Sequence, residues 1–550
     1  MAETLAEVDT VLSTLQVNFP TAEICEVDGR TALVLEADGL HEVLTSLRTN
    51  GSYSLADVTA VDLSALAGEA APLRIVYQLR AVQAPFACLQ LSADFDPEET
   101  ALASVTDLFP GADWQEREVA EMFGVRFTGR SATRALILHS LSSVHPLRKS
   151  YPLLGEGETD NPAPTGVDTA ALITPIPTLR LRLEVVAGRV VRAAPVPGFA
   201  HSGIEKLSES LTCTQNMVVC ERLNDQSPHA ASLTLALAVE AMLGIEVPPR
   251  GNFQRVVIAE LSRLAGHLAW LAVQTETAGA DRVWRQAMQL RAAVLQTMGR
   301  LRGVGTGTGL LAIGGQAADF PDDFTNCGLA LSRSVRVAVA RLQKQLMGNR
   351  LWRDLVDGVA ALSAHEADEW GLSGPVQRAC GTPSDLRRTT PYLAYGELDF
   401  EVPVGSNGDA LDRCRVRMEE MVESTGLIEQ ALRSMPTGAW RTEDARVFPA
   451  TSGQVRERVE VLIRHMQLWT EGHGLRLPSG AACYQATESP NGEFGVFLCA
   501  DGTDRPYRLH LRSPSLMNFQ VAGGLVADLP MAQARQALCS LNVVPAEMDR

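Results

Sequence analysis

Apolar residues recur with two different periods along the chain. In its first part, short β-branched and apolar runs predict strands at residues 31–35, 73–79 and 87–91. A three-to-four-residue spacing of apolar side chains predicts helices at residues 5–15 and 98–108. Because strands and helices are mixed over a short length, we expect residues 1–153 to form a small α+β domain.

Residues 154–177 interrupt this pattern. They include GEGETDNPAPTG and several further prolines, which cannot sustain a helix or a central strand. This segment is therefore interpreted as a linker. Beyond it, residues 179–185 and 190–194 predict a pair of strands joined at Gly188.

Long helices are expected to dominate residues 178–550. Apolar side chains at Phe253, Val257, Leu261, Leu264, Leu268 and Leu271 form one stripe on a helix that follows Pro248 and Pro249. A second stripe comprises Leu411, Cys414, Met418, Met421, Ile428 and Leu432. Stripes of this kind are usually core, so the second domain is predicted to be mainly α-helical, with small β-sheets.

Charge and length narrow the possible partners. The 550-residue chain carries a formal net charge of −17, which disfavours nucleic acid as a partner because phosphate binding relies on Lys and Arg. The first ten residues, MAETLAEVDT, are acidic where a signal peptide would be basic. Apolar runs such as residues 233–239 are too short to cross a bilayer. Membrane attachment, if any, is expected to run through partner subunits.

The ten cysteines include no CxxC pair. This scatter is typical of reduced thiols that pack as small apolar side chains. Iron–sulfur clusters and structural zinc sites usually need clustered thiolates, so no metal site is expected on this chain.

Two strings in the first domain carry a family resemblance. LFPGADWQEREVAEMFGVRF at residues 108–127 is followed by HPLRKSYPL at residues 145–153. Together they resemble the 30-kDa subunit of complex I, the respiratory NADH dehydrogenase. The first string also reads as an amphipathic helix whose inward side chains are Trp114, Val119, Met122 and Phe123. The resemblance implies a docking domain beside iron–sulfur subunits, without catalysis of its own.

The second domain resembles the 49-kDa subunit of complex I. The matching strings are PGFAHSGIEK, VEAMLGIEVPPR, RVVIAELSRLAGHL, RACGTPSDLRRTTPY, TESPNGEFG, RLHLRSPS and the terminal MDR. The resemblance implies the fold of the large subunit of [NiFe] hydrogenases, and the two complex I subunits are fused here in one polypeptide. TESPNGEFG also reads as a glycine-permitted turn between strands, with Glu488 and Glu493 as partners of nearby arginines.

The hydrogenase relatives hold nickel and iron with two CxxC pairs. In register with these pairs, the present chain has Asn224 and Ser227 at the first and Val544 and Glu547 at the second. Soft thiolates suit these metals, and all four are missing. The resemblance therefore implies that this chain is not a Ni–Fe hydrogenase and that the Ni–Fe ligand positions are lost.

In complex I the same cavity takes a quinone headgroup, which needs a nearby proton donor. His201, in PGFAHSGIEK, is matched to the quinone-contacting histidine of the family, and a histidine can donate near neutral pH. The quinone-binding tyrosine is matched to Asp225, and the aspartate that partners the histidine is matched to Thr277. Asp225 lacks the phenol ring, and Thr277 cannot charge-stabilise an imidazole.

Several charged residues near the start of one predicted helix are candidates for a surface that faces the cluster-bearing subunit. They are Arg250, Arg255, Arg263 and His267. The alternative is that these residues, together with Glu260, form weak ion pairs on a solvated helix face. The string DLRRTTPY, with Asp385, Arg387 and Arg388, matches the family but could equally be turn chemistry.

The resemblance implies an electron-output subunit of a complex I-like or hydrogenase-related oxidoreductase, which uses NAD(P)H or another donor and quinone as substrate. An iron–sulfur cluster is expected in a small partner subunit, with integral membrane subunits beneath and this chain on the cytoplasmic side. No cofactor is expected on this chain, and another subunit would bind NADH, because GTGTGLLAIGG lacks the setting of a dinucleotide fingerprint. The alternative is a catalytically silent scaffold in an energy-converting-hydrogenase-related complex that uses another acceptor.

Overall fold

The computed structural model describes residues 23–27, 30–50, 53–66, 73–82, 88–130, 135–138, 144–155, 179–301, 309–450, 452–470 and 475–550. The helix predicted at residues 5–15 lies outside the described residues, as do residues 156–177 of the predicted linker. The division of the chain into residues 1–153 and 178–550 stays a prediction.

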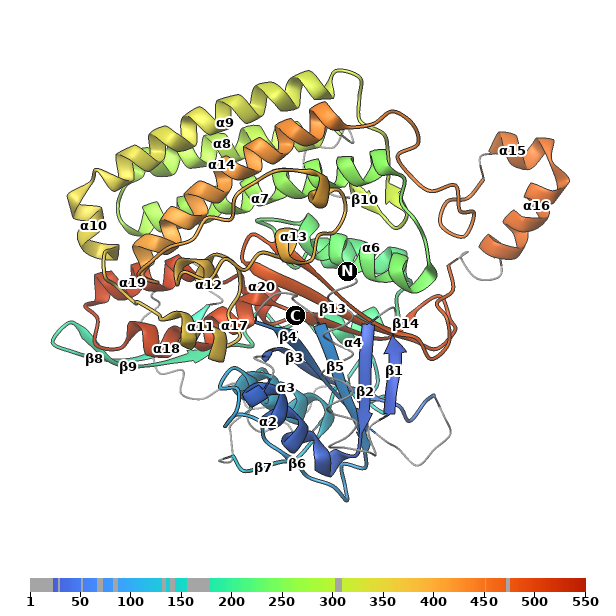
Figure 1. Ribbon diagram of the computed structural model, residues 1–550, viewed down its shortest axis with the longest axis horizontal. Coiled ribbons are helices and arrows are strands. Elements are labelled where there is room, and N and C mark those ends of the chain that lie inside the picture. Colours follow the sequence, from blue (N-terminus) through green and yellow to red (C-terminus); the bar gives the residue numbers. More distant parts are fainter. Residues whose placement is uncertain are drawn as a thin grey trace.

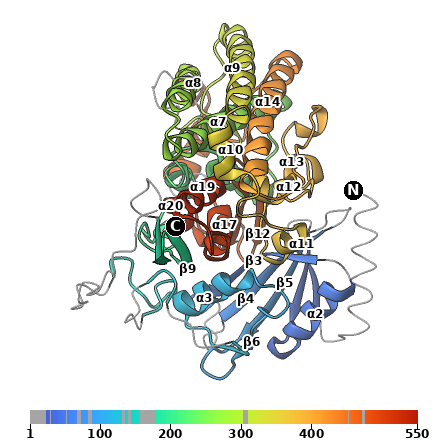
Figure 2. The same ribbon diagram turned by 90° about the vertical axis from the view of Figure 1, so that its left-hand side faces the viewer.

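The first region is built on a five-stranded sheet in the order β1-β2-β5-β4-β3. Its strands are β1 (Glu23–Val27), β2 (Arg30–Leu35), β3 (Tyr53–Asp62), β4 (Leu73–Ala81) and β5 (Cys88–Phe95). β2 and β5 are parallel and the other neighbours are antiparallel. The three predicted strands are confirmed as β2, β4 and β5. Helices α2 (Leu40–Asn50) and α3 (Ala112–Phe123) accompany this sheet (Figure 2).

The helix predicted at residues 98–108 is wrong. The segment instead contains the short strand β6 (Leu102–Ala103), which pairs in parallel with β7 (Phe127–Thr128). The amide of Leu102 donates to the Arg126 carbonyl at 2.9 Å, so its backbone is committed to a ladder rather than to a helix. Asp96 folds the preceding turn by accepting from the Glu98 amide at 2.9 Å.

Long helices form the opposite layer of the molecule (Figures 1 and 2). They are α6 (His229–Leu243), α7 (Pro249–Thr277), α8 (Asp281–Arg300), α9 (Phe324–Met347) and α14 (Ala410–Ser434). Both stripes noted in the sequence are confirmed as the buried faces of α7 and α14. Pro249 begins α7, where a missing amide hydrogen costs no helical bond.

The length and hydropathy of α7 differ from the expectation that the apolar runs of this chain are too short to cross a bilayer. Among the described residues, it is the one helix long and apolar enough to cross a membrane. Of its most apolar window, however, 83% is buried within this chain. Burial on this scale is the expectation for a core helix, so the length of α7 is no evidence of a span.

A second antiparallel sheet lies between the two layers, in the order β12-β13-β14. Its strands are β12 (Ala482–Ser489), β13 (Gly492–Ala500) and β14 (Pro506–Arg512). All nine residues of β13 are buried. The predicted turn in TESPNGEFG is confirmed between β12 and β13, where Gly492 has φ +135° and a Cβ would meet Ser373 at 2.4 Å.

The remaining elements are short. The hairpins are β8 (Arg180–Val186) with β9 (Arg189–Val196), as predicted, and β10 (Leu311–Ala312) with β11 (Gly315–Gln316). The helices of the first half are η1 (Ala37–Gly39), α4 (Ile204–Ser208) and α5 (Cys213–Glu221). Those of the second half are α10 (Arg350–Val356), α11 (Ala364–Glu369), α12 (Gly374–Ala379), α13 (Leu386–Thr389), η2 (Tyr395–Glu397), α15 (Ser452–Glu457), α16 (Val459–His465), η3 (Met466–Thr470), α17 (Pro514–Gln520), α18 (Ala522–Val526), α19 (Met531–Leu541) and α20 (Pro545–Met548).

The apolar core joins the two ends of the chain. One large cluster combines α6, α7, α9 and α14 with the inner faces of β12, β13 and β14. A second large cluster combines the first sheet with α17, α18, α19 and α20. The last 40 residues therefore pack on the first region, and both predicted domains contribute side chains to this second cluster (Figure 2).

Candidate functional site

The four positions matched to lost Ni–Fe ligands meet in the interior. The amide nitrogen of Asn224 donates to Oε2 of Glu547 at 2.5 Å, and Asn224 Oδ1 accepts from the Ser227 amide at 3.1 Å. The amide of Val544 donates to Ser515 Oγ at 3.1 Å, and this hydroxyl donates to Glu547 at 2.9 Å. The structure thus brings the loop before α6 against α20, as the register of the two strings implied. The four side chains offer amide, hydroxyl, isopropyl and carboxyl groups but no sulfur.

Glu547 is buried among neutral hydrogen-bond donors. Its side chain accepts from Asn224, Ser513 and Ser515, and no Lys, Arg or His among the described residues forms an ion pair with it. Burial without a compensating cation raises the pKa of Glu547 above its ordinary range. The protonated form of Glu547 is therefore more favourable than that of an exposed glutamate.

His201 lies on the loop between β9 and α4, beside α20. Its Nδ1 donates to the main-chain carbonyl of Asp549 at 2.6 Å, and the neighbouring Ala200 amide donates to the Asp549 carboxylate at 2.8 Å. Because Nδ1 is held as a donor, the neutral ring keeps Nε2 as its acceptor. Gly198 allows the loop to pass close to Ile137, because it has φ +100° and a Cβ there would lie 2.4 Å from the Ile137 carbonyl.

The other two cavity positions have separate surroundings. Asp225 is exposed, and its main-chain carbonyl accepts from Arg291 at 3.1 Å. Thr277, at the end of α7, donates to the Val273 and Gln274 carbonyls at 3.1 and 3.0 Å and accepts from Gln536 at 2.9 Å. Across the described residues, no hydrogen bond joins either residue to His201. The three positions therefore form no hydrogen-bonded constellation in this structure.

The candidate partner-facing residues of α7 point inward. Arg255 pairs with Glu240, with a shortest distance of 2.5 Å, and His267 pairs with Glu420 at 2.9 Å. Arg263 donates to the carbonyls of Glu488 and Ser489 and lies 3.4 Å from Glu260. All three side chains are buried, so neither a solvated helix face nor direct exposure to a partner describes them. Arg250 is half-buried and pairs with Asp319 at 3.0 Å.

Burial determines the protonation of His267. Removal from water lowers its pKa to about 4, although Glu420 opposes this shift. The ring is therefore neutral at physiological pH. Glu420 keeps its charge because Arg378, at 2.7 Å, holds the pKa of that carboxyl well below its usual range against the effect of burial.

A buried network of arginines and carboxylates surrounds this pair. Arg387 binds Asp385 at 2.7 Å and Glu260 at 3.0 Å, and Tyr395 donates to Glu260 at 2.6 Å. Burial alone would raise the pKa of Asp385, but Arg387 and Arg378 lower it. The turn-chemistry alternative for DLRRTTPY is correct for Asp385, which caps α13, yet the same residue is also a member of the network. Sequence alone showed the charges but not their burial.

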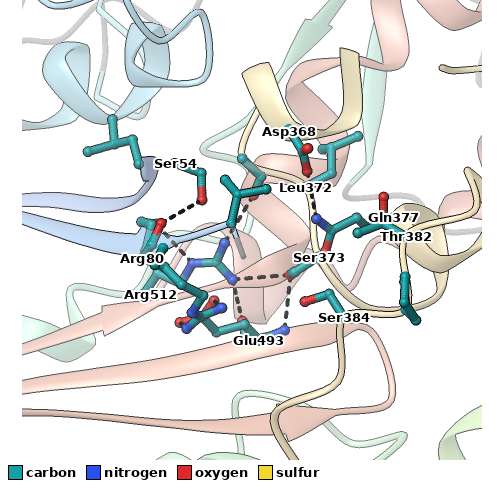
Figure 3. A pocket seen from close by; sticks show the side chains of 16 residues that line it. Ser54, Arg80, Asp368, Leu372, Ser373, Gln377, Thr382, Ser384, Glu493 and Arg512 are labelled. Atoms are coloured by element: carbon teal, nitrogen blue, oxygen red, sulfur yellow. Dashed lines mark hydrogen bonds and ion pairs between the residues drawn. The ribbon is translucent and has the colours of Figure 1, made fainter. Parts of the chain in front are cut away.

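Several polar contacts join the first region to the second. Glu493 on β13 binds Arg80 on β4, an arginine more than 400 positions away in the sequence. Both side chains are labelled in Figure 3. Nearby, Arg512 donates to Ser373 Oγ at 3.3 Å and to the Gly371 carbonyl at 3.1 Å. These side chains line a cavity of about 140 Å³ at the seam. That volume is below the range of ordinary ligand pockets, so we interpret it as a packing gap between the regions.

Another contact between the regions is a buried cluster around His510 on β14. Its Nε2 lies 3.0 Å from Asp57 on β3, and its Nδ1 lies 3.0 Å from Glu205 on α4. Burial opposes protonation of the ring, but these two carboxylates raise the pKa of His510 to about 9. Glu118, Glu205 and His510 are close enough to hold a metal ion. Arg508 and Arg550 already neutralise the two glutamates, so the donor set fits an ion-pair network better than a metal site.

The described cysteines bear out the sequence reading of the thiols. Cys213, Cys220, Cys380, Cys414, Cys483, Cys499 and Cys539 are buried, and Cys88 and Cys327 are half-buried. Burial raises the pKa of the Cys220 and Cys414 thiols to about 12. These thiols are therefore packed as apolar side chains rather than held as thiolates.

The fold, and the absence of sulfur from the side chains at positions 224, 227, 544 and 547, define a class of protein: a fusion of the two peripheral respiratory subunits suggested by the motifs. The family model for the 30 Kd subunit of respiratory-chain NADH dehydrogenase matches residues 33–157, and that for the 49 Kd subunit matches residues 278–550. The C/D subunit of NADH-quinone oxidoreductase from Bdellovibrio bacteriovorus is 32% identical over 472 residues, which cover 82% of this chain and 84% of the relative. This chain belongs to the family of fused C/D subunits of complex I.

Relatives that correspond to the second region alone are also similar. The D subunit of NADH-quinone oxidoreductase from Anaplasma phagocytophilum is 38% identical over 384 residues, which cover 68% of this chain and 93% of the relative. The D subunit from Wolbachia pipientis wMel is 35% identical over 372 residues, which cover 68% of this chain and 95% of the relative. The resemblance read from the motifs is therefore confirmed, and the chain is a component of a membrane-associated oxidoreductase complex with other subunits.

Proposed function

We propose that this chain is the electron-output subunit of its complex and forms the cavity in which a quinone is reduced. The quinone gains two electrons and two protons and becomes a quinol. The electrons come from NADH, which another subunit oxidises, by way of an iron–sulfur cluster in a small neighbouring subunit. The chain itself binds no redox cofactor, has the hydrogenase-large-subunit-like fold in its second region, and sits on the cytoplasmic side above integral membrane subunits.

One observation carries the proposal. The site matched to the hydrogenase metal centre is closed by the 2.5 Å hydrogen bond between Asn224 and Glu547 and contains no thiolate. Soft metals such as nickel select thiolate ligands, which a carboxyl and an amide do not replace. This composition supports the quinone use of the fold over the hydrogenase use.

In this proposal His201 supplies a proton to the quinone. The bond from Nδ1 to the Asp549 carbonyl fixes the ring orientation, and Nε2 is the atom that exchanges the proton. Asp549 lies beside the same loop, and burial raises the pKa of its carboxyl group. A carboxyl with a raised pKa is a suitable source from which the imidazole is reprotonated after it donates.

The test uses the purified complex that contains this chain. Metal analysis is combined with reduction of a soluble quinone, with NADH or an artificial donor as reductant. Quinone turnover without nickel is expected. His201→Ala is expected to abolish turnover, whereas His365→Ala, whose side chain is 75% exposed, is the matched control and is expected to leave turnover unchanged. Full turnover in His201→Ala would contradict the proposal that His201 donates a proton to the quinone.

A silent scaffold is the second candidate. It is favoured by the separation of Asp225 and Thr277 from His201, since no hydrogen bond among the described residues links them. The double variant Asp225→Tyr with Thr277→Asp distinguishes the two candidates. A shift in the preference among quinone acceptors, with assembly intact, supports the output role. Unchanged acceptor kinetics, in a complex whose clusters are reducible, support the scaffold.

A further inference from the structure

A helical arm stands away from the body of the molecule. It comprises α15, α16 and the π-helical turn η3, residues 452–470, and Figure 1 shows it projecting beyond the long helices. The indole of Trp469 connects the arm to the body, because its Nε1 donates to the Ala445 carbonyl at 3.2 Å. We call residues 452–470 the arm.

The outer face of the arm is apolar. Val459, Leu462, Ile463 and Met466 are 71%, 42%, 51% and 52% exposed. Their spacing of three and four residues places them on one stripe of the α16–η3 helix. A single exposed apolar side chain needs no explanation, but a contiguous stripe on a projecting helix is typical of an interaction surface.

The inner face of the arm is apolar as well. Val461, Leu468 and Trp469 face the segment 439–450 across a groove of about 460 Å³, to which Trp440 and Phe448 contribute. A short helix with apolar side chains on both faces is expected to be buried rather than solvated. Residues 459–469 of the arm therefore carry apolar side chains on two faces, although the arm projects from the body.

The charge of the groove is opposite to that of the whole chain. Arg441 and Arg464 line it, and the acidic residue that lines it is Glu443. The Arg441 guanidinium lies 4.4 Å from the Phe448 ring centre and 5.6 Å from that of Trp440. In a chain with a net charge of −17, this groove combines aromatic walls with an excess of positive charge. An acidic segment with apolar anchors is complementary to it.

We propose that the arm and its groove are the docking site for an acidic, amphipathic segment of another subunit of the same complex. Apolar anchors of that segment fill the groove and cover the stripe, and its carboxylates pair with Arg441 and Arg464. This inference rests on the proposed function only in requiring that the chain works within an assembly. A second copy of this chain is a poorer occupant, because two bodies of charge −17 repel.

Assembly of the complex tests the docking site. Ile463→Glu places a charge in the stripe and is expected to lower the amount of one co-purifying subunit by about tenfold or more, because a desolvated charge at an interface costs at least that factor. Val337→Glu on α9, where Val337 is 61% exposed, is the matched control and is expected to retain every subunit. Arg441→Glu with Arg464→Glu is expected to lower retention of the same subunit.

Photocrosslinking identifies the occupant in the assembled complex. A benzophenone amino acid at Leu462 is expected to form an adduct with one other subunit, on a peptide in which acidic residues outnumber basic ones. An adduct with a second copy of this chain, with lipid, or with a basic peptide would overturn the proposal. So would the absence of an adduct, or full retention of all subunits in Ile463→Glu. None of these outcomes depends on quinone turnover, so they are separate from the test of His201.

Discussion

Asn224 and Glu547 are 323 positions apart and share a 2.5 Å hydrogen bond in the interior. The bond holds the loop before α6 against α20, at positions matched to the metal-ligating thiolates of hydrogenase relatives. Because the other donors to Glu547 are the hydroxyls of Ser513 and Ser515, the carboxyl has no positive charge to stabilise its ionised form. Its neutral form is therefore favoured by the fold.

Glu547→Gln is expected to preserve the folded structure, because a glutamine has nearly the shape of the neutral carboxyl group. Glu547→Ala is expected to lower the free energy of unfolding by about 1–3 kcal/mol, because the buried amide of Asn224 and two hydroxyls lose their acceptor. Urea unfolding of the full chain measures both changes. Equal losses in the two variants would contradict a neutral carboxyl group at this position.

The difference in unfolding free energy between wild type and Glu547→Gln is expected to depend on pH. Burial raises the folded-state pKa of Glu547 above its unfolded value near 4.5. The folded state therefore binds more protons, so the stability from Glu547 is full below pH 4.5 and is lost as pH rises through the folded pKa. The difference in unfolding free energy between wild type and Glu547→Gln should fall over that window. A difference that is constant with pH contradicts the assignment.

The stabilisation that the His510 cluster gives to the folded state should be lost at alkaline pH. The pKa of His510 is raised from 6.5 in the unfolded chain to about 9, so its stabilisation is full below pH 6.5 and is lost as pH rises through 9. At one pKa unit per about 1.4 kcal/mol, the loss is about 3 kcal/mol. Unfolding free energies measured below pH 6.5 and above pH 9 test this expectation.

Asp57→Asn removes one of the two carboxylates at His510 and should move that loss to lower pH. Asp94→Asn is the matched control on the same sheet, because the Arg74–Asp94 pair is more than a third exposed on both sides and contributes little. A pH profile that is the same in Asp57→Asn and wild type would exclude His510 as the titrating group.

Arg80→Met should lower the free energy of unfolding, because it removes an ion pair between the two regions. The variant leaves the buried Glu493 without its arginine, and loss of one partner of a buried pair costs about 3–5 kcal/mol. Arg74→Met, on the same strand, removes the exposed pair with Asp94 and should cost less than about 1 kcal/mol. Urea unfolding compares the two, and similar losses would mean that the seam is solvated.

Gly198→Ala should displace the His201 loop. A Cβ at this position would lie 2.4 Å from the Ile137 carbonyl, and φ +100° is disfavoured for alanine. Gly188→Ala has a comparable φ of +78° but no atom within 4 Å of its Cβ, so it controls for backbone strain alone. Quinone turnover of the complex should fall about tenfold or more in Gly198→Ala and stay unchanged in Gly188→Ala. Equal turnover in both variants would separate the loop position from catalysis.

The candidate site could be predicted from the sequence only in part. The strings around residues 224 and 547 predicted that these two distant segments lie together, and the structure brings them together. Their match to a metal site stays a prediction. The register could not show that Asn224 donates to Glu547, or that Asp225 is exposed and Thr277 is bonded to its own helix. Hydrogen-bond partners depend on side-chain positions that no spacing specifies.

The sequence by itself determined the elements with a strong local period. The stripes of α7 and α14, the β8–β9 hairpin and the β12–β13 turn follow from apolar spacing and glycine, which act within a few residues. Where a local turn competed, at residues 98–108, the same reading was wrong, because Asp96 and the ladder with β7 decided the backbone.

Only the tertiary structure decided which charges are interior. Arg255, Arg263 and His267 have the spacing of a solvated helix face, yet each is buried against a carboxylate or carbonyl from another element. Arg80 finds Glu493 across 413 positions. The sequence shows the type of a charged residue but not whether its side chain is hydrated or paired. The choice is made by desolvation and by the partner that the fold places beside it, and both arise only when distant segments pack.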